Sequence, residues 1–128
     1  MLISQFAPQS PLIARMDADD FSYPQRIEKQ CHFLNTHHLD AVGCQVRIVD
    51  DTGHPSPSMR RYQKWINDET ADGTTIESLR FVELPLVNPT ILARRHYFDL
   101  GFRMGDFPED YDLLLRAANR GMQFGKLN

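Results

Sequence analysis

The stretch Ile13-Ala14-Arg15-Met16-Asp17-Ala18-Asp19-Asp20 decides the fold class of this 128-residue chain. The apolar residues from Leu12 to Met16 predict a short strand, and the aspartates after them predict a turn. Carboxylates this close together repel one another unless a cation lies among them. Open α/β sheets bind ligands at the carboxyl ends of their strands, which is where this acidic turn would lie.

The sequence after the acidic turn alternates between helical and extended patterns. Ser22 and Gln25 have the spacing of a capping box, and a helix is expected from about Pro24 to Asn35. Apolar residues at every second position predict a strand over 42–48. The polar segment from His54 to Thr75 is expected to be a loop that carries one short helix.

The second half of the chain contains the clearest helical pattern. Extended segments are expected at 81–87 and 89–93. The helix expected from Glu109 to Arg120 has an acidic first turn, an apolar face and Gly121 as its stop. A closing strand is expected over 122–127. These elements mix strands and helices without regular alternation, so the pattern alone leaves both the α/β and the α+β class open.

Composition and charge restrict the classes of function. The chain is 41% hydrophobic and 24% charged, as in ordinary soluble domains, and its length suffices for one core. The net charge of −3 provides no basic surface for nucleic acid. No apolar run is long enough to cross a bilayer. The two cysteines, Cys31 and Cys44, are too few for a disulfide framework and fit a reducing compartment.

The acidic turn has a structural and a chemical interpretation. Its carboxylates, Asp17, Asp19 and Asp20, could simply favour a turn and the start of the next helix. They could instead hold Mg²⁺ or Mn²⁺, because these ions prefer carboxylate and phosphate oxygens. A calcium EF-hand is excluded, because Phe21 and Ser22 occupy loop positions that need an oxygen ligand and a glycine.

A second acidic cluster begins the helix near the end of the chain. Glu109, Asp110 and Asp112 could stabilise the helix N-terminus through the helix dipole. One of them could instead act as a general base that takes the proton of an attacking hydroxyl. A metal site and a base are together the minimum equipment for metal-assisted group transfer, although neither cluster is specific by itself.

Read together, the two clusters and their flanks resemble family-two glycosyltransferases of the GT-A fold. The segments that carry the resemblance are 13–20 (acidic metal motif), 21–34 (helix), 41–53 (strand and turn), Asn88-Pro89-Thr90 with Arg94-Arg95 (acceptor side), 107–115 (catalytic helix) and 121–128 (trailing strand). The resemblance implies an α/β fold, namely a partial Rossmann-like nucleotide-diphospho-sugar transferase domain. Residues 1–11 would be an irregular lead-in, and residues 12–128 the partial domain.

The resemblance implies transfer of a sugar from a nucleotide-diphosphate donor to a hydroxyl of a glycan or other acceptor. Asp17 and Asp19 would hold the divalent metal, Mn²⁺ or Mg²⁺, that bridges the donor diphosphate. Asp17 and Asp20 would also contact the donor. The metal would neutralise charge on the departing nucleotide diphosphate.

The resemblance also implies a catalytic base. Asp110 would deprotonate the acceptor hydroxyl and lead to inversion at the anomeric carbon, while Glu109 and Asp112 would orient or cap the helix in support. Asn88 departs from the pattern, because the family usually has histidine at this position. Arg94, Arg95 and Arg116 could contact phosphate or the acidic helix, although solvated arginines at the surface are the more common case.

The segments that resemble the family do not include its first unit, which binds the nucleotide base. We therefore expect the chain alone to be inactive or weakly active. The strand at 12–16 would expose an edge, and a second copy would cover it in a homodimer, with domain swapping as an alternative. A cytoplasmic location is expected, with the inner face of the membrane as the alternative.

Two other functions remain open. A non-catalytic remnant of the same fold could bind a metal or a partner, or serve as an oligomerising module. A metal-dependent hydrolase could use the same carboxylates, but its kind usually recruits several histidines. The five histidines of this chain show no paired metal-ligand spacing, so the hydrolase ranks third.

Overall fold

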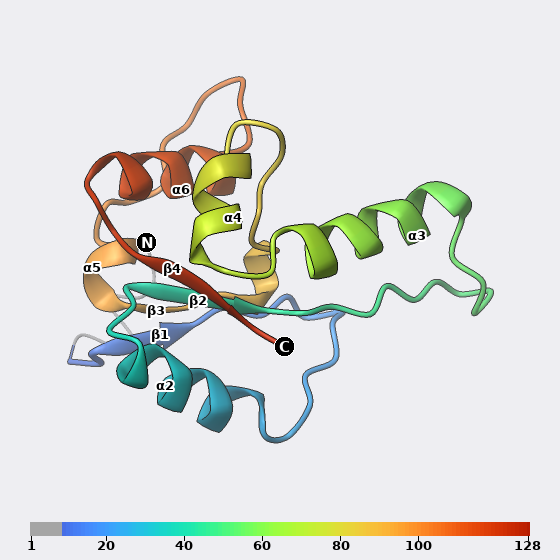
Figure 1. The fold of residues 1–128 in the computed structure, drawn as a ribbon, viewed down its shortest axis with the longest axis horizontal. Helices are drawn as coiled ribbons and strands as arrows, with labels where there is room; N and C mark the ends of the chain where they lie inside the picture. Colours follow the sequence, from blue (N-terminus) through green and yellow to red (C-terminus); the bar gives the residue numbers. More distant parts are fainter. Residues whose placement is uncertain (1–8) are drawn as a thin grey trace.

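A four-stranded mixed sheet forms the middle of the computed structural model, which describes residues 9–128 (Figure 1). Its strand order is β1-β3-β2-β4. Strand β1 (Leu12–Ala14) pairs antiparallel with β3 (Leu92–Arg94), which pairs antiparallel with β2 (Ala41–Cys44). Strand β2 pairs in parallel with β4 (Phe124–Leu127). Within the described residues, β1 and β4 are therefore the edge strands.

Helices cover both faces of the sheet. Helix α2 (Arg26–Thr36) lies on one face, whereas α4 (Gly73–Leu79) and α6 (Glu109–Asn119) lie on the other (Figure 1). The remaining helical elements are α3 (Pro57–Lys64), the π-helix η1 (Trp65–Glu69), the 3-10 helix η2 (Asn88–Thr90) and the single turn α5 (Arg95–Phe98). The result is a three-layer α/β/α arrangement. In this architecture, ligands bind at the carboxyl ends of the strands.

Alternation along the strands divides the core into two parts. Val42 and Leu92 point toward α2 and pack with Leu34. Their neighbours Ala41 and Ala93 point to the opposite face, into a larger cluster. The larger cluster also contains Ile76, Leu86, Ile91, Tyr97, Phe98, Leu113, Leu114, Ala117 and Phe124. Successive strand residues face opposite sides, so both faces of this sheet are buried.

The strongest sequence patterns are confirmed by the structure. The helix expected over 24–35 is α2, and the closing strand is β4. The helix expected from Glu109 is α6, and Gly121 follows it with a φ of 80°, the left-handed conformation that glycine adopts without strain. The opening strand is also present, although it ends at Ala14. Residues 1–8 of the expected lead-in lie outside the described residues.

The expected capping box and the length of the second strand are wrong. Helix α2 begins after Gln25 without a side-chain cap, and the Ser22 hydroxyl donates to Tyr23 O instead. Strand β2 ends at Cys44 rather than continuing to residue 48. Beyond it, the Val46 N–H donates to Asn67 Oδ1 at 2.9 Å, so a side chain takes the place of a neighbouring strand.

The expected loop from His54 to Thr75 is also wrong, because most of it is helical. Ser56 caps α3 by accepting from the Met59 N–H at 3.2 Å. Asp72 and Thr75 form a capping box at the start of α4. The segment 81–87 is likewise not extended but consists of turns and bends.

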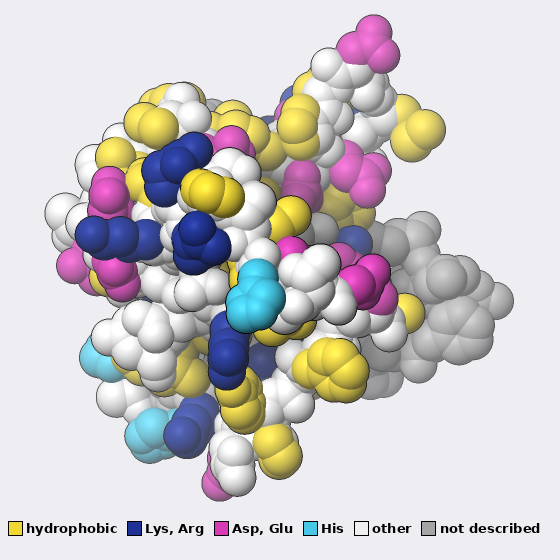
Figure 2. Space-filling model, turned by 90° about the vertical axis from the view of Figure 1, so that its right-hand side faces the viewer, with side chains coloured by type: hydrophobic (Ala, Val, Ile, Leu, Met, Phe, Trp, Pro, Cys, Tyr) yellow, Lys and Arg dark blue, Asp and Glu magenta, His cyan; other side chains and the backbone are white. Residues whose placement is uncertain are grey.

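Helix α3 extends from the body of the molecule, and none of its residues is buried (Figure 1). Figure 2 looks onto this end and shows Lys and Arg side chains interspersed with Asp and Glu, so this face carries no continuous basic surface. Cys31 and Cys44 are free thiols and half-buried. In the part of the chain that the structure describes, no helix is long and apolar enough to cross a membrane.

A buried lysine joins β4 to the segment around η1. Lys126 is only 3% exposed, and its ammonium donates to Ile66 O and Thr70 Oγ1 and, at 3.0 Å, to Pro85 O. Burial lowers the pKa of Lys126 to about 8, because the charged form loses its hydration. No sequence pattern predicted that Lys126 would be buried.

The pKa of Lys126 predicts a pH-dependent contribution to stability. Between about 8 and 10.5 the unfolded chain binds more protons at this side chain than the folded chain does. The free energy of unfolding of the native chain should therefore rise with pH across this window. The rise should exceed that of Lys126→Met by about 2 kcal/mol. Urea unfolding of both proteins at several pH values measures this difference. A difference that stays constant with pH would contradict the lowered pKa.

Candidate active site

The sheet topology brings the two acidic segments to the same end of the strands. Strands β1, β2 and β4 run in one direction, because β1 and β2 are both antiparallel to β3 and β4 is parallel to β2. The acidic turn Asp17–Asp20 follows the carboxyl end of β1. Helix α6 runs back over β4, so its first turn lies toward the carboxyl end of that strand (Figure 1). Both segments therefore lie at the carboxyl ends of the strands, where α/β sheets bind ligands.

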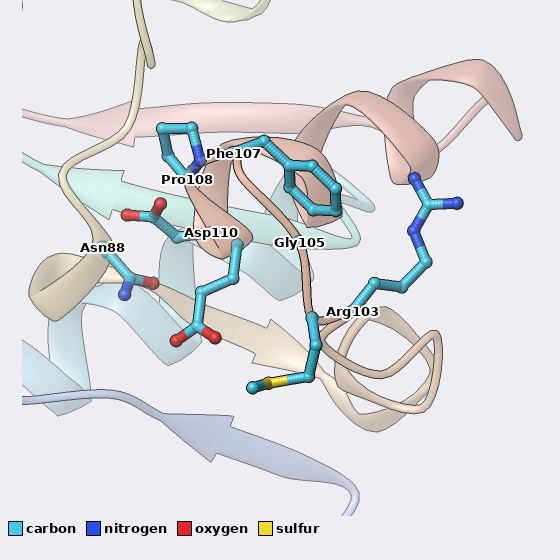
Figure 3. Close-up of a pocket in the computed structure, with 8 residues that line it drawn as sticks. Asn88, Arg103, Gly105, Phe107, Pro108 and Asp110 are labelled. Atoms are coloured by element: carbon cyan, nitrogen blue, oxygen red, sulfur yellow. The ribbon is translucent and has the colours of Figure 1, made fainter.

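A cavity of about 420 Å³ lies at the start of α6. It is lined by Glu109 and Asp110 of α6, by Asn88 of η2, and by the loop residues Arg103, Met104, Gly105, Phe107 and Pro108. In Figure 3, the Asn88 and Asp110 side chains project toward a common space, whereas Arg103 points away from it. The cavity thus combines a carboxylate with an amide, two groups that can bind and orient hydroxyl groups.

Asp110 has one fixed oxygen. Its Oδ1 accepts from the Tyr111 N–H at 2.9 Å, and the side chain is half-buried. Burial raises the pKa of Tyr62, and the negative charges of Glu83 and Asp110 raise it further. Burial likewise raises the pKa of Tyr97, with Asp110 again adding to the effect. Both phenols therefore stay protonated near neutral pH, and the charge of Asp110 contributes to this.

Asp112 does not line the cavity but holds the loop that does. Its carboxylate accepts from Arg103 Nε at 3.0 Å and from Arg116 Nε at 2.8 Å, and a second Arg103 nitrogen also donates to it. Hydrogen bonds from Arg103 and Arg116, and the charges of both, lower the pKa of Asp112 to about 2. Arg116 also donates to Leu100 O at 2.9 Å. Asp112 therefore supports the cavity, and Arg116, one turn further along the same helix, holds its carboxylate.

The acidic turn is open to solvent. Its backbone closes with a hydrogen bond from the Asp20 N–H to Asp17 O at 3.2 Å, and Asp17 lies 3.7 Å from the Arg15 guanidinium. Arg15 also lies 5.7 Å from the centre of the Phe102 ring, which precedes the cavity loop. Asp19 and Asp20 are exposed. The exit of β1 and the loop before α6 are thus in contact.

Among residues 9–128, no three His, Cys, Asp or Glu side chains come together as ligands for a metal. Asp17 is held toward Arg15, and the two other aspartates point into solvent. This donor set fits an ion such as Mg²⁺ only if one or two carboxylates bind it and phosphate or water completes the shell.

Sequence reasoning missed the residues that shape the cavity. Arg103, Met104 and Phe107 line it, but they come from a loop without periodic pattern. The signal available in the sequence was Gly101 and Gly105 ahead of the acidic helix, which indicate a loop and not its contents. The sequence marks Asn88 only as a departure from a family pattern, whereas the structure places it in the lining of the same cavity as Asp110.

Comparisons with known proteins extend over most of the chain. The O-antigen biosynthesis glycosyltransferase WbnJ of Escherichia coli is 30% identical over 110 residues, which are 84% of this chain and 40% of that protein. The bifunctional glycosyltransferase pgtA of Dictyostelium discoideum is 33% identical over 51 residues, or 39% of this chain and 7% of that protein. The chain thus spans less than half the length of these relatives. No solved structure matches it at a significant level.

The family model that matches is named Glycosyl transferase family 2. It covers residues 7–107, which include the acidic turn, Asn88 and most of the cavity loop, and it stops before Glu109 and Asp110. The match accounts for well over half of the chain. This chain belongs to glycosyl transferase family 2.

Proposed function

We propose that this chain transfers a sugar from a nucleoside-diphosphate donor to an acceptor hydroxyl, with inversion at the anomeric carbon. Membership of the family supports the reaction class. The assignment of residues is supported by two positions: Asp17–Asp20 follow the carboxyl end of β1, and Asp110 lines the cavity at the start of α6. One segment can serve the leaving group and the other the attacking hydroxyl.

Asp110 is the proposed general base. Its carboxylate takes the proton of the acceptor hydroxyl while the oxygen forms a bond to the anomeric carbon, and the bond from that carbon to the donor diphosphate breaks. Attack opposite to the leaving group inverts the configuration. Glu109 is exposed at the same helix start, where it orients the acceptor, and Asp112 holds the loop through Arg103.

Asp17 and Asp19 are the proposed ligands of a divalent metal, Mn²⁺ or Mg²⁺, and Asp17 and Asp20 the proposed donor contacts. Such an ion, when bound, neutralises charge on the departing diphosphate. The open turn supports this assignment, because it leaves room for phosphate oxygens beside one or two carboxylates. Arg15, held toward Asp17, adds a positive charge at the same place.

A saccharide is the proposed acceptor. The Escherichia coli relative is named for O-antigen biosynthesis, and a carbohydrate acceptor is consistent with the groups in the cavity. The Asn88 amide can hydrogen-bond hydroxyl groups, and Phe107, 43% exposed, offers an aromatic face to the apolar side of a sugar ring.

The assembly and location of the protein are proposals as well. We propose that a second copy pairs with β1, one of the two edge strands of the described sheet, to form a homodimer. We further propose a cytoplasmic protein that works at or near the inner membrane face. Light scattering that gives the mass of one chain would contradict the dimer.

The metal role predicts a specific loss of nucleotide binding. In calorimetric titrations, uridine and guanosine diphosphate should bind the chain more tightly with Mn²⁺ than without it. The double variant Asp17→Asn, Asp19→Asn should bind the Mn²⁺–nucleotide complex at least about tenfold more weakly, because it lacks the carboxylate ligands. The variant Asp51→Asn, Asp68→Asn removes the same charge from exposed positions elsewhere and should behave like the native chain.

Two outcomes would change the proposal. If the Asp17, Asp19 variant binds the Mn²⁺ complex as well as the native chain does, these residues are not the metal ligands. If the native chain binds no nucleoside diphosphate even with Mn²⁺, a non-catalytic binding or oligomerising module becomes the better description.

A further inference from the structure

We propose that Arg26, held in place by Gln30, is a positioning residue that fixes the exit of β1 against the turn Asn88–Thr90. The exit of β1 leads into the acidic turn, and Asn88 lines the cavity that contains Asp110. The inference rests on the proposed roles of these two segments. It adds a residue from a third element, α2, that sets their relative position.

Arg26 bridges the two segments through their backbone carbonyl groups. Its Nη2 donates to Arg15 O at 2.7 Å, and its Nη1 donates to Pro89 O at 3.1 Å. Arg15 lies two residues before Asp17, and Pro89 directly follows Asn88. Since the guanidinium is planar and rigid, both carbonyl oxygens are held at a separation that the fork of the side chain defines.

Gln30 fixes the orientation of that fork. It lies one helical turn after Arg26 on the same face of α2, and its Oε1 accepts from Arg26 Nε at 3.0 Å. The Gln30 side chain is fully buried, and its Nε2 donates to Thr90 O at 2.8 Å and to Val42 O at 3.1 Å. The pair therefore ties α2, β2 and the turn Asn88–Thr90 into one network.

Of the hydrogen bonds that join the exit of β1 to the rest of the structure, the one donated by Arg26 lies nearest to the acidic turn. The Arg15 N–H donates to Ile91 O at 2.8 Å, which continues the pairing of β1 with the segment before β3. The next backbone hydrogen bond along the chain, from Asp20 N–H to Asp17 O, is local. The bond from Arg26 to Arg15 O thus anchors the last residues before Asp17 to the rest of the sheet edge.

Arg94 provides a matched control. It makes the same kind of contacts, from Nε to Leu39 O at 3.0 Å and from Nη2 to Asn35 Oδ1 at 3.2 Å. These contacts lie at the opposite ends of the strands, away from the acidic turn and the cavity. Losing either arginine removes hydrogen bonds to a carbonyl, but only Arg26 touches the proposed site.

The test compares Arg26→Met, Arg26→Lys and Arg94→Met in the full chain. Amide hydrogen exchange should be about tenfold faster at Arg15, Thr90 and Ile91 in Arg26→Met than in the native protein, because the hydrogen bonds to both carbonyl groups, Arg15 O and Pro89 O, are lost. Arg26→Lys keeps the charge and the stem but cannot donate to both carbonyls from one plane, so it should be intermediate. Arg94→Met should leave exchange at these amides unchanged.

The second readout is the affinity for nucleoside diphosphate with Mn²⁺. It should fall about tenfold in Arg26→Met and remain native in Arg94→Met, even where the two lower the melting temperature equally. Unchanged exchange at the three amides would overturn the inference, as would weakened exchange protection with native Mn²⁺–nucleotide affinity. If the native chain does not bind Mn²⁺–nucleotide at all, the proposed function fails, and the exchange data alone decide whether Arg26 positions the two segments.

Discussion

Asp110→Asn should slow sugar transfer by about 10²–10⁴-fold, the contribution typical of a general base. An asparagine amide cannot take the proton of the acceptor hydroxyl, although its Oδ1 can still accept from the Tyr111 N–H as Asp110 does. The helix start therefore keeps its local hydrogen bond. The free energy of unfolding should change by no more than about 1 kcal/mol, the range of a single charge at a helix N-terminus.

The measurement is the initial rate of nucleoside diphosphate release with saccharide acceptors, in the longest natural protein that contains this chain and transfers sugar. Glu109→Gln is the matched control, because it removes the same charge from the neighbouring position. A glutamine amide can still hydrogen-bond and orient the acceptor hydroxyl but cannot act as a base, so that variant should retain most of the rate. If Glu109→Gln loses the activity and Asp110→Asn keeps it, the base is Glu109 and the assignment of Asp110 is wrong.

The parts of the fold that could be predicted are those whose signals are local. Helix α6 carries an acidic first turn, an apolar face and a terminal glycine within a dozen residues, and the structure follows that pattern. Helix α3 lacks such a face, because none of its residues is buried. Its start was nevertheless marked by Ser56 and Pro57, a helix signal that the polar composition of the segment concealed.

The parts that could not be predicted depend on distant segments. Strand β2 looked longer in sequence, because its alternating pattern continues beyond Cys44. The structure ends it there, and the Asn67 and Gln63 side chains then take the N–H groups of Val46 and Ile48. No local pattern reports that two side chains from a later helix will replace a strand partner.

The site divides in the same way. The acidic turn and the first turn of α6 were evident from composition and position, and the sheet brings both to one edge. The contacts of Arg26 and Lys126 could not be predicted, because their partners are backbone carbonyls far away in sequence. A carbonyl oxygen belongs to every residue, so the sequence carries no mark that identifies which ones a buried cation will bind.

Leu34→Ala should lower the free energy of unfolding by about 2–5 kcal/mol, because Leu34 is fully buried in the smaller of the two cores. Its fully buried neighbours in that core are Val42 and Leu92, both on central strands whose positions the sheet ladder fixes. These neighbours cannot move far enough to fill the cavity that the truncation leaves. The loss of unfolding free energy should therefore lie in the upper part of the range. A domain of this size has about 5–15 kcal/mol in total.

Urea unfolding of Leu34→Ala beside Ile27→Ala tests this orientation of α2. Ile27 lies on the same helix but is 43% exposed, so its truncation should lower the free energy of unfolding by less than about 1.5 kcal/mol. Since α2 also carries Arg26 and Gln30, loosening its packing should weaken the network at the sheet edge as well as the core. Equal losses for the two variants would mean that α2 turns a different face to the sheet, and the bridge from Arg26 to the acidic turn would fall with it.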